Sequence, residues 1–368
     1  MRAIAENFRF CLLTLLITGA QPKLAVADKP QHGLLTRTDG TTSLPITSAV
    51  DWKKRREEIL QGMQEAMGPL PSRANLPSLD PRWEEEFAGP TFTRHKVTFV
   101  SEGTSRVSCY LFIPKGVREG TAPGVIALHQ TVLEGKGEPA GLTPNKNQRY
   151  GLELAERGYV VLAPDYPSFG EYAHDFDADD YQSGTMKGIF DHLRAVDLLT
   201  SLKEVDPTRI GAIGHSLGGH NAIFLGAFDE RVKVVVSCCG WTSFAKYYGG
   251  DLTGWTSARY MPRIRTAYNL DPARMPFDFD GAIAAIAPRA FLSISPLHDD
   301  NFAVEGVRQT IAEVEQVYAL VGAPENLHVE YPDCKHDFPP EMRAKAYDFI
   351  ERALRPAAAS PSSLAPAK

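Results

Sequence analysis

The sequence of 368 residues predicts an α/β fold, with a mostly parallel central sheet covered by helices on both faces. From about residue 124 onward, short apolar runs alternate with longer helical patterns, as expected when crossover helices connect parallel strands. The runs at 124–129 (GVIALH) and 159–164 (YVVLAP) are apolar at nearly every position, which is typical of strands buried on both faces. An earlier pair of β-rich runs indicates antiparallel strands at one edge.

The first 27 residues predict a signal peptide for export. Arg2 and Arg9 supply a basic start, and residues 10–17 (FCLLTLLI) form an apolar run too short to span a bilayer. Small residues at 25–27 offer a cleavage site before Asp28, and a short membrane anchor is the alternative interpretation. We therefore expect a periplasmic or secreted protein.

Residues 28–92 are expected to form a linker and a helix that packs on the main domain. Residues 28–47 are polar, whereas 49–67 place apolar side chains at helical spacing and end at Gly68. Residues 69–90 are proline-rich and extended.

The main domain is expected at residues 93–356, and a Pro/Ala/Ser-rich tail at 357–368 is expected to be disordered. A hairpin is predicted around Gly103. The predicted strands are 94–100, 107–113, 124–129, 159–164, 210–213, 232–237, 290–294 and 327–331, and the predicted helices are 147–157, 185–202, 221–228, 304–320 and 341–354.

Between strand 210–213 and helix 221–228, residues 214–218 (GHSLG) fit the pattern Gly-x-Ser-x-Gly. A nucleophilic serine on a tight strand-to-helix turn requires this context, because side chains at the glycine positions would clash where strand and helix approach. The pentapeptide alone is weak evidence, since chance produces it in about one chain of this length in ten. A glycine-rich turn is the alternative.

A serine hydroxyl needs a base to accept its proton and an acid to orient that base. Asp299 lies in the segment after strand 290–294, and His336 lies in the segment after strand 327–331. The carboxyl ends of parallel strands meet at one edge of the sheet, so Ser216, Asp299 and His336 are expected there in the order Ser, Asp, His.

The sequence resembles α/β-hydrolases over residues 94–355, and among them the dienelactone-hydrolase-like and acetyl-xylan-esterase-like serine esterases. The matching features are the strand ending at His129, the turn at 163–166 (APDY), the serine motif and residues 335–338 (KHDF). The resemblance implies that residues 93–356 form a catalytic domain with an inserted lid at 241–287.

By this resemblance Ser216 is the nucleophile, His336 the base and Asp299 the acid. Relatives tend to have an apolar residue three places after the acid, which Phe302 fits from Asp299 better than Ala303 fits from Asp300. The amides of Leu217 and Gln130 are expected to form the oxyanion hole. Many relatives have glycine where this chain has Gln130, so its side chain is expected to narrow the mouth or add a donor.

The implied activity is hydrolysis of carboxylic esters through an acyl-enzyme, on acetyl or other esters of carbohydrates or on small molecules, with no metal and no cofactor. The insertion is dense in aromatic residues. They either stack on substrate or form the lid's own core. The candidate substrate-binding residues are His129, Trp241, Tyr247 and Trp255.

Packing is the favoured interpretation for His215 and His220, whereas His298 adjoins the acid. The acidic run 175–180 lacks the glycine and glutamate of a calcium loop and is interpreted as solvated. The mature chain keeps four cysteines, which allow up to two disulfides but are more simply small buried hydrophobes: Cys109, Cys238, Cys239 and Cys334.

The formal net charge of −6 argues against nucleic acid or an anionic membrane as the main partner. One alternative function is a serine peptidase of the prolyl-oligopeptidase type, although such enzymes usually carry a propeller domain larger than the segment before this sheet. A non-catalytic binding protein on the same fold is the other alternative, and it would be marked by loss of the serine, the acid or the histidine.

Overall fold

The computed structural model describes residues 33–39 and 42–355. The predicted signal peptide and C-terminal tail lie outside the described residues. Across the part of the chain that is described, no helix combines the length and the apolar character that crossing a membrane would need.

The central sheet has nine strands in the order β11-β10-β9-β8-β6-β7-β5-β4-β3. The six strands from β11 to β7 pair in parallel, and β5, β4 and β3 join one edge as antiparallel strands. This confirms the predicted fold class. The strands are β3 (Arg82–Ala88), β4 (Phe92–Glu102), β5 (Ser105–Pro114), β6 (Ala122–Leu128), β7 (Val160–Pro164), β8 (Val205–His215), β9 (Val232–Cys238), β10 (Ala290–Ile294) and β11 (Leu327–Glu330).

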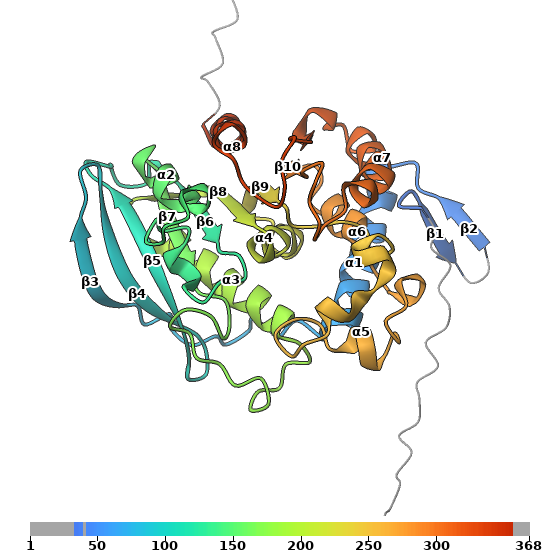
Figure 1. Cartoon of the computed structure of the whole chain (residues 1–368), viewed down its shortest axis with the longest axis horizontal. Helices are drawn as coiled ribbons and strands as arrows, with labels where there is room; N and C mark the ends of the chain where they lie inside the picture. The colour runs from blue at the N-terminus through green and yellow to red at the C-terminus, as the bar shows by residue number, and fades with distance from the viewer. Residues whose placement is uncertain (1–32, 40–41, 356–368) are drawn as a thin grey trace, which may run out of the picture.

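Helices cover both faces of the sheet (Figure 1). Along β6, Ile126 and Leu128 join the core formed with α1, α3, α4, α6 and α7, whereas Val125 and Ala127 join the core formed with α2 and α8. This alternation follows from the two-residue period of a strand. The helices are α1 (Ala49–Met67), α2 (Tyr150–Glu156), α3 (Gly184–Ser201), α4 (Leu217–Phe228), α6 (Phe279–Ala284), α7 (Val304–Leu320) and α8 (Pro340–Leu354).

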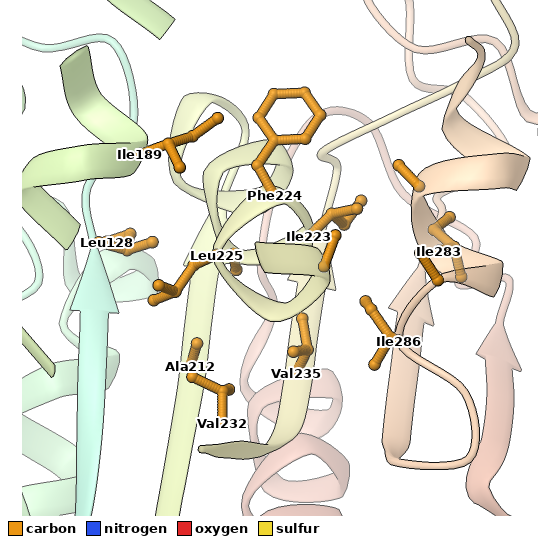
Figure 2. Close-up of a cluster of buried hydrophobic side chains, with 14 of the residues drawn as sticks. Leu128, Ile189, Ala212, Ile223, Phe224, Leu225, Val232, Val235, Ile283 and Ile286 are labelled. Atoms are coloured by element: carbon orange, nitrogen blue, oxygen red, sulfur yellow. The ribbon is translucent and has the colours of Figure 1, made fainter. Parts of the chain in front are cut away.

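Helix α4 is apolar on every side, as expected for a helix surrounded by protein. Figure 2 shows Ile223, Phe224 and Leu225 among side chains from β6, β8, β9, α3 and the region of α6. Because α4 is enclosed in this way, the turn at its N-terminus, which carries Ser216, is held firmly against the sheet.

Three strands depart from the sequence prediction. The segment interpreted as a linker contains a hairpin, β1 (Thr36–Asp39) and β2 (Thr42–Pro45), and the proline-rich segment contains β3. Strand β3 (RWEEEFA) is exposed along its whole length and lacks an apolar alternation. It exists because β4 offers it an edge to pair with, which the local sequence does not reveal.

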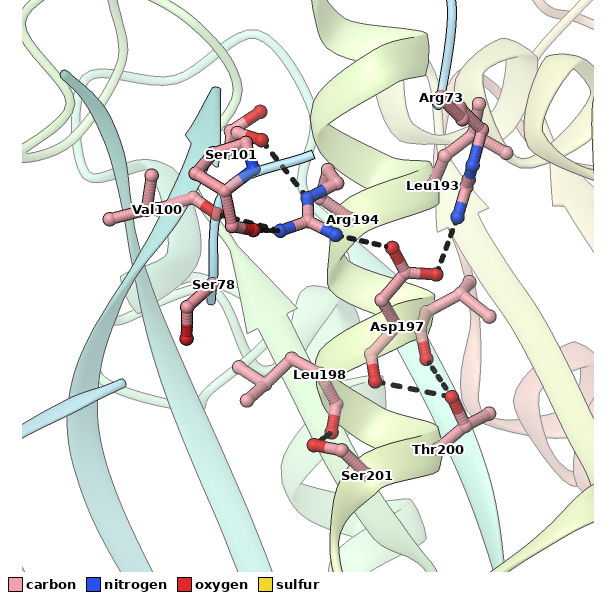
Figure 3. Close-up of polar contacts among 12 residues, drawn as sticks. Arg73, Ser78, Val100, Ser101, Leu193, Arg194, Asp197, Leu198, Thr200 and Ser201 are labelled. Carbon is pink, nitrogen blue, oxygen red and sulfur yellow. Dashed lines mark hydrogen bonds and ion pairs between the residues drawn. The ribbon is translucent and has the colours of Figure 1, made fainter. Parts of the chain in front are cut away.

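The segment before β3 is attached to α3 by arginine contacts (Figure 3). Arg194 of α3 donates to the carbonyl oxygens of Pro77 at 2.8 Å and Ser101 at 3.0 Å, and it pairs with Asp197 at 2.7 Å. Arg73 pairs with the other oxygen of Asp197 at 2.6 Å. These contacts fix the extended segment against the main domain.

The insertion between β9 and β10 folds into short helices that lie against α1 (Figure 1). Arg263 and Tyr268 donate hydrogen bonds to the carbonyl oxygen of Glu65 in α1. Besides α6, the insertion contains η3 (Tyr247–Gly250), η4 (Leu252–Trp255), α5 (Arg263–Thr266) and η5 (Pro272–Arg274).

Candidate active site

Ser216 occupies the tight turn between β8 and α4, with φ 54° and ψ −116°. A Cβ on Gly214 would lie 2.2 Å from the backbone of Gly218, and a Cβ on Gly218 would lie 1.9 Å from the carbonyl oxygen of Leu128. The glycines of the motif are therefore required by close backbone approach. The Ser216 side chain does not cap α4, which leaves its hydroxyl available for other contacts.

His336 and Asp299 are paired. Nδ1 of His336 lies 3.0 Å and 2.9 Å from the two carboxylate oxygens of Asp299. The backbone N–H groups of Asn301 and Phe302 donate to Oδ1 of Asp299, which is buried, whereas Asp300 is exposed. The Phe302 ring stacks on His336, with the ring centroids 6.0 Å apart.

The same strand ends bring this pair next to the serine turn. The amide of Ser216 donates to the carbonyl oxygen of Cys238 at 2.9 Å, and the ring of His215 meets that of His336 edge-on at 4.7 Å. Within the described residues, no hydrogen bond joins the Ser216 hydroxyl to His336. In enzymes without substrate such bonds are often long or poorly aligned.

The amides of Leu217 and Gln130, the predicted oxyanion donors, lie on two backbone segments that approach each other closely. The end of β6 approaches the first turn of α4 so closely that the Leu128 carbonyl meets Gly218. The amides of Leu217 and Gln130 donate no hydrogen bond to any described residue. An unpaired N–H group, such as that of Leu217 at the positive end of α4, suits a developing oxyanion.

Both atoms of the Gln130 side-chain amide are bonded to neighbouring side chains, so its Nε2 is not the free donor that was one of the two expectations. Its Nε2 donates to Glu138 at 2.8 Å, and its Oε1 accepts from Nδ1 of His215 at 3.0 Å. Burial raises the pKa of Glu138 to about 7 and lowers the pKa of His215 well below its ordinary value. Glu138, Gln130 and His215 therefore form a chain that fixes the loop carrying the Gln130 amide.

His129 braces the same loop instead of facing substrate. Its Nε2 accepts from the amide of Tyr166 at 2.9 Å, and its Nδ1 contacts the carbonyl oxygen of Gln130 at 2.6 Å. Only 2% of the residue is exposed, and burial lowers its pKa. Both ring nitrogens have partners inside the protein, so His129 has no free nitrogen to offer a substrate. The expectation that His129 binds substrate is corrected accordingly.

The aromatic residues of the insertion mostly form its own core. Trp241 is 1% exposed and donates to Ser293 Oγ at 2.8 Å, and Trp255 is 3% exposed. Tyr247 packs on Trp255 and Phe302. These three candidates are therefore buried. Their surroundings fit the interpretation that the aromatic residues form the insertion's own core, not the interpretation that they stack on substrate.

Tyr260, an aromatic residue of the insertion, packs against Leu217, the residue after the candidate nucleophile. Its hydroxyl lies 3.1 Å from Oγ1 of Thr131, and its ring packs with Leu217 and Phe169. The neighbouring Arg259 lies over the Phe169 ring at 4.3 Å. Tyr260 is one of many aromatic residues in the insertion, and no sequence motif marks Tyr260, Arg259 or Thr131.

A cavity of about 870 Å³ opens beside the β4–β5 hairpin, and its lining includes Glu102, Tyr172, Asp175 and Lys187. None of the candidate catalytic residues lines it. Asp175 accepts from the amide of Asp177 at 3.0 Å, which is the local bonding expected of a solvated loop.

The four described cysteines are unpaired thiols, and Cys109, Cys238 and Cys239 are buried. Cys239 follows β9 with φ 50°. His215, Cys239 and His336 each offer one potential ligand atom, and these three atoms lie within 4.8 Å of one another. The three residues could therefore hold a metal ion.

Known proteins resemble the chain in sequence and in fold. The model of the prolyl oligopeptidase family (Peptidase_S9) matches residues 148–356, more than half of the chain. The putative hydrolase YtaP of Bacillus subtilis (strain 168) is 28% identical over 315 residues, which cover 82% of this chain and 99% of that protein.

Solved structures share the fold at lower identity. A glucuronoyl esterase from Solibacter usitatus superposes with a TM-score of 0.68 at 21% identity, covering 87% of this chain and 96% of that one. A putative acetyl xylan esterase from Bacteroides fragilis NCTC 9343 superposes with a TM-score of 0.61 at 16% identity, covering 82% of this chain and 88% of that one. At these identities the likeness is one of fold.

Proposed function

The chain belongs to the prolyl oligopeptidase family of α/β-hydrolases, and from this premise we propose that it is a serine hydrolase of carboxylic esters, with carbohydrate esters as its substrate class. The observation that carries the proposal is the pairing of His336 Nδ1 with the buried Asp299, next to the strained turn that holds Ser216.

In the proposed mechanism, Ser216 Oγ attacks the ester carbonyl while Nε2 of His336 takes the hydroxyl proton. Asp299 holds Nδ1–H and stabilises the imidazolium that forms. His336 then returns the proton to the leaving alcohol, which departs and leaves Ser216 acylated. Water attacks the acyl-enzyme in the same way and releases the acid.

The amides of Leu217 and Gln130 are proposed to hold the oxyanion in both steps. Support for Gln130 comes from the clamp on its side chain, because Glu138 and His215 together prevent the loop from turning its amide away. Preorganised donors of this kind are worth about 10²–10³ in kcat per donor in other acyl-transfer enzymes.

Carbohydrate esters are supported by two observations. Two solved structures that cover most of the chain are described as a glucuronoyl esterase and a putative acetyl xylan esterase. In addition, Tyr260 and Thr131 offer hydroxyl groups beside Leu217, and polar hydroxyls next to an aromatic ring suit a sugar. We extend this to export through the predicted signal peptide at residues 1–27.

Peptide hydrolysis is the second candidate, because the family match is to prolyl oligopeptidases and a dipeptidyl-peptidase 5 of Porphyromonas gingivalis is 34% identical over 112 residues. That match covers only 29% of this chain, whereas the esterase folds cover more than four-fifths of it.

The test is a panel of substrates assayed with wild type and Ser216→Ala. We expect hydrolysis of p-nitrophenyl acetate, acetylated xylan or a glucuronoyl methyl ester, lost in Ser216→Ala, and no cleavage of proline-containing peptide p-nitroanilides. Cleavage of the anilides in preference to every ester would identify a peptidase instead.

A further inference from the structure

Three potential metal ligands meet beside the serine turn. The Sγ of Cys239 and one ring nitrogen each from His215 and His336 all lie within 4.8 Å of one another. The residues come from the ends of β8 and β9 and from the loop after β11, so the carboxyl edge of the sheet brings them together. The proposed hydrolytic mechanism uses His336 as the base, whereas it uses only Nδ1 of His215, which holds Gln130, and makes no use of the Cys239 thiol.

One ring nitrogen of His215 is unshared. Its Nδ1 lies 3.0 Å from Oε1 of Gln130, an atom that can only accept, so Nδ1 carries the proton and Nε2 the lone pair. Nε2 is buried and has no hydrogen-bond partner among the described residues, and the side chain is 1% exposed. A buried acceptor without a partner is costly and calls for an explanation such as an ion.

His336 is oriented in the same way. Asp299 holds its Nδ1 at 2.9 Å, which leaves Nε2 as the free donor of an electron pair. Histidines that bind metals almost always donate their other ring N–H to a carboxylate or a carbonyl oxygen. Both imidazoles of the cluster already have that partner, Asp299 for His336 and Gln130 for His215.

We propose that His215, Cys239 and His336 form a binding site for Zn²⁺. Two imidazoles and a thiolate are ligands that Zn²⁺ prefers, with Zn–N distances of about 2.0–2.1 Å and Zn–S of about 2.3 Å. Tetrahedral donors at those distances lie roughly 3.5 Å apart, so closure needs side-chain shifts of about 1 Å. On binding, the Cys239 thiol gives its proton to solvent, and a water fills the fourth position.

Occupation of the site inhibits ester hydrolysis, and this consequence rests on the proposed function. A metal on Nε2 of His336 takes the electron pair that must accept the Ser216 proton. The binding itself is independent of catalysis, so it is measured in the full-length Ser216→Ala variant, which keeps all three ligands.

Binding is tested by equilibrium dialysis of Ser216→Ala against Zn²⁺, and by Co²⁺ absorption as a probe of thiolate ligation. We expect one tightly bound metal per chain and a sulfur-to-cobalt charge-transfer band. Adding Cys239→Ser removes the band and weakens Zn²⁺ binding at least tenfold, and adding His215→Asn weakens it similarly. Cys109→Ser is the matched control, because this buried thiol donates to the carbonyl oxygen of Val97 and lies outside the cluster, and it leaves band and affinity unchanged.

The proposal is overturned if the band and the affinity persist in both Cys239→Ser and His215→Asn, or if Ser216→Ala binds no metal. Circular dichroism confirms that each variant is folded. In the catalytic chain, Zn²⁺ lowers esterase activity reversibly with EDTA, and Cys239→Ser loses this sensitivity relative to its own metal-free rate. Metal binding without any esterase activity contradicts the proposed function and leaves the zinc site standing.

Discussion

Asp299 and Asp300 are neighbours in the sequence with opposite surroundings. Asp299 is buried, accepts two backbone hydrogen bonds and faces His336, whereas Asp300 is exposed. The sequence predicted Ser216, Asp299 and His336 as the candidate triad because strand ends and a short motif mark them. It did not predict the chain from Glu138 through Gln130 to His215, because the contact joins the β6–α2 connection to the end of β8 and no motif records that contact.

Asp299→Asn is expected to lower kcat by about 10³–10⁴, because an amide neither fixes the imidazole tautomer nor stabilises its cation. Asp300→Asn is the matched control and is expected to change kcat less than about threefold, as an exposed side chain away from His336. Steady-state kinetics on p-nitrophenyl acetate measure both. A larger loss in Asp300→Asn would transfer the role of the acid to that residue.

Glu138→Gln tests the buried clamp through the dependence of stability on pH. Burial raises the pKa of Glu138 from 4.5 to about 7, so the folded protein holds this proton more tightly than the unfolded chain. The Glu138 contribution to stability therefore falls as pH rises from about 4.5 to about 7. Urea unfolding measures the free energy of unfolding of Glu138→Gln and of wild type. We expect the variant's value minus the wild-type value to be about 2 kcal/mol larger at pH 8 than at pH 5. An equal difference at both pH values would show that Glu138 ionises normally.

At the scale of elements, the insertion between β9 and β10 acts as packing for the site. Trp255 contacts His220, Tyr247 and Phe302, and Phe302 stacks on His336. The sequence predicted the boundaries of the insertion and its aromatic content. It could not decide between stacking on substrate and packing, because the same residue types serve both.

Trp255→Ala is expected to destabilise the protein by about 3–5 kcal/mol, because it removes a large side chain from a closed cluster. Tyr248→Ala, in the same insertion but 60% exposed, is the control and is expected to cost less than about 1 kcal/mol. Thermal unfolding measures both. A Trp255→Ala protein of wild-type stability with a raised KM for bulky esters only would restore the substrate-stacking interpretation.

At the scale of the whole molecule, the parallel part of the sheet was predictable because its strands are apolar at nearly every position. The antiparallel edge was predicted only in part. Strand β3 and the β1–β2 hairpin depend on pairing with neighbouring strands, and their own residues are largely polar. The pattern of apolar residues in a strand reflects which of its side chains are buried, and these strands bury few side chains.

The molecule as a whole is proposed to place one nucleophile at the carboxyl edge of its sheet. Intact-mass spectrometry after reaction with a fluorophosphonate tests this claim most directly, because such reagents modify only an activated serine. We predict one adduct per chain, located on Ser216 by peptide mapping, absent in Ser216→Ala and much slower to form in Asp299→Asn. An adduct that persists in Ser216→Ala, or a wild-type protein that forms none while hydrolysing esters, would contradict the account.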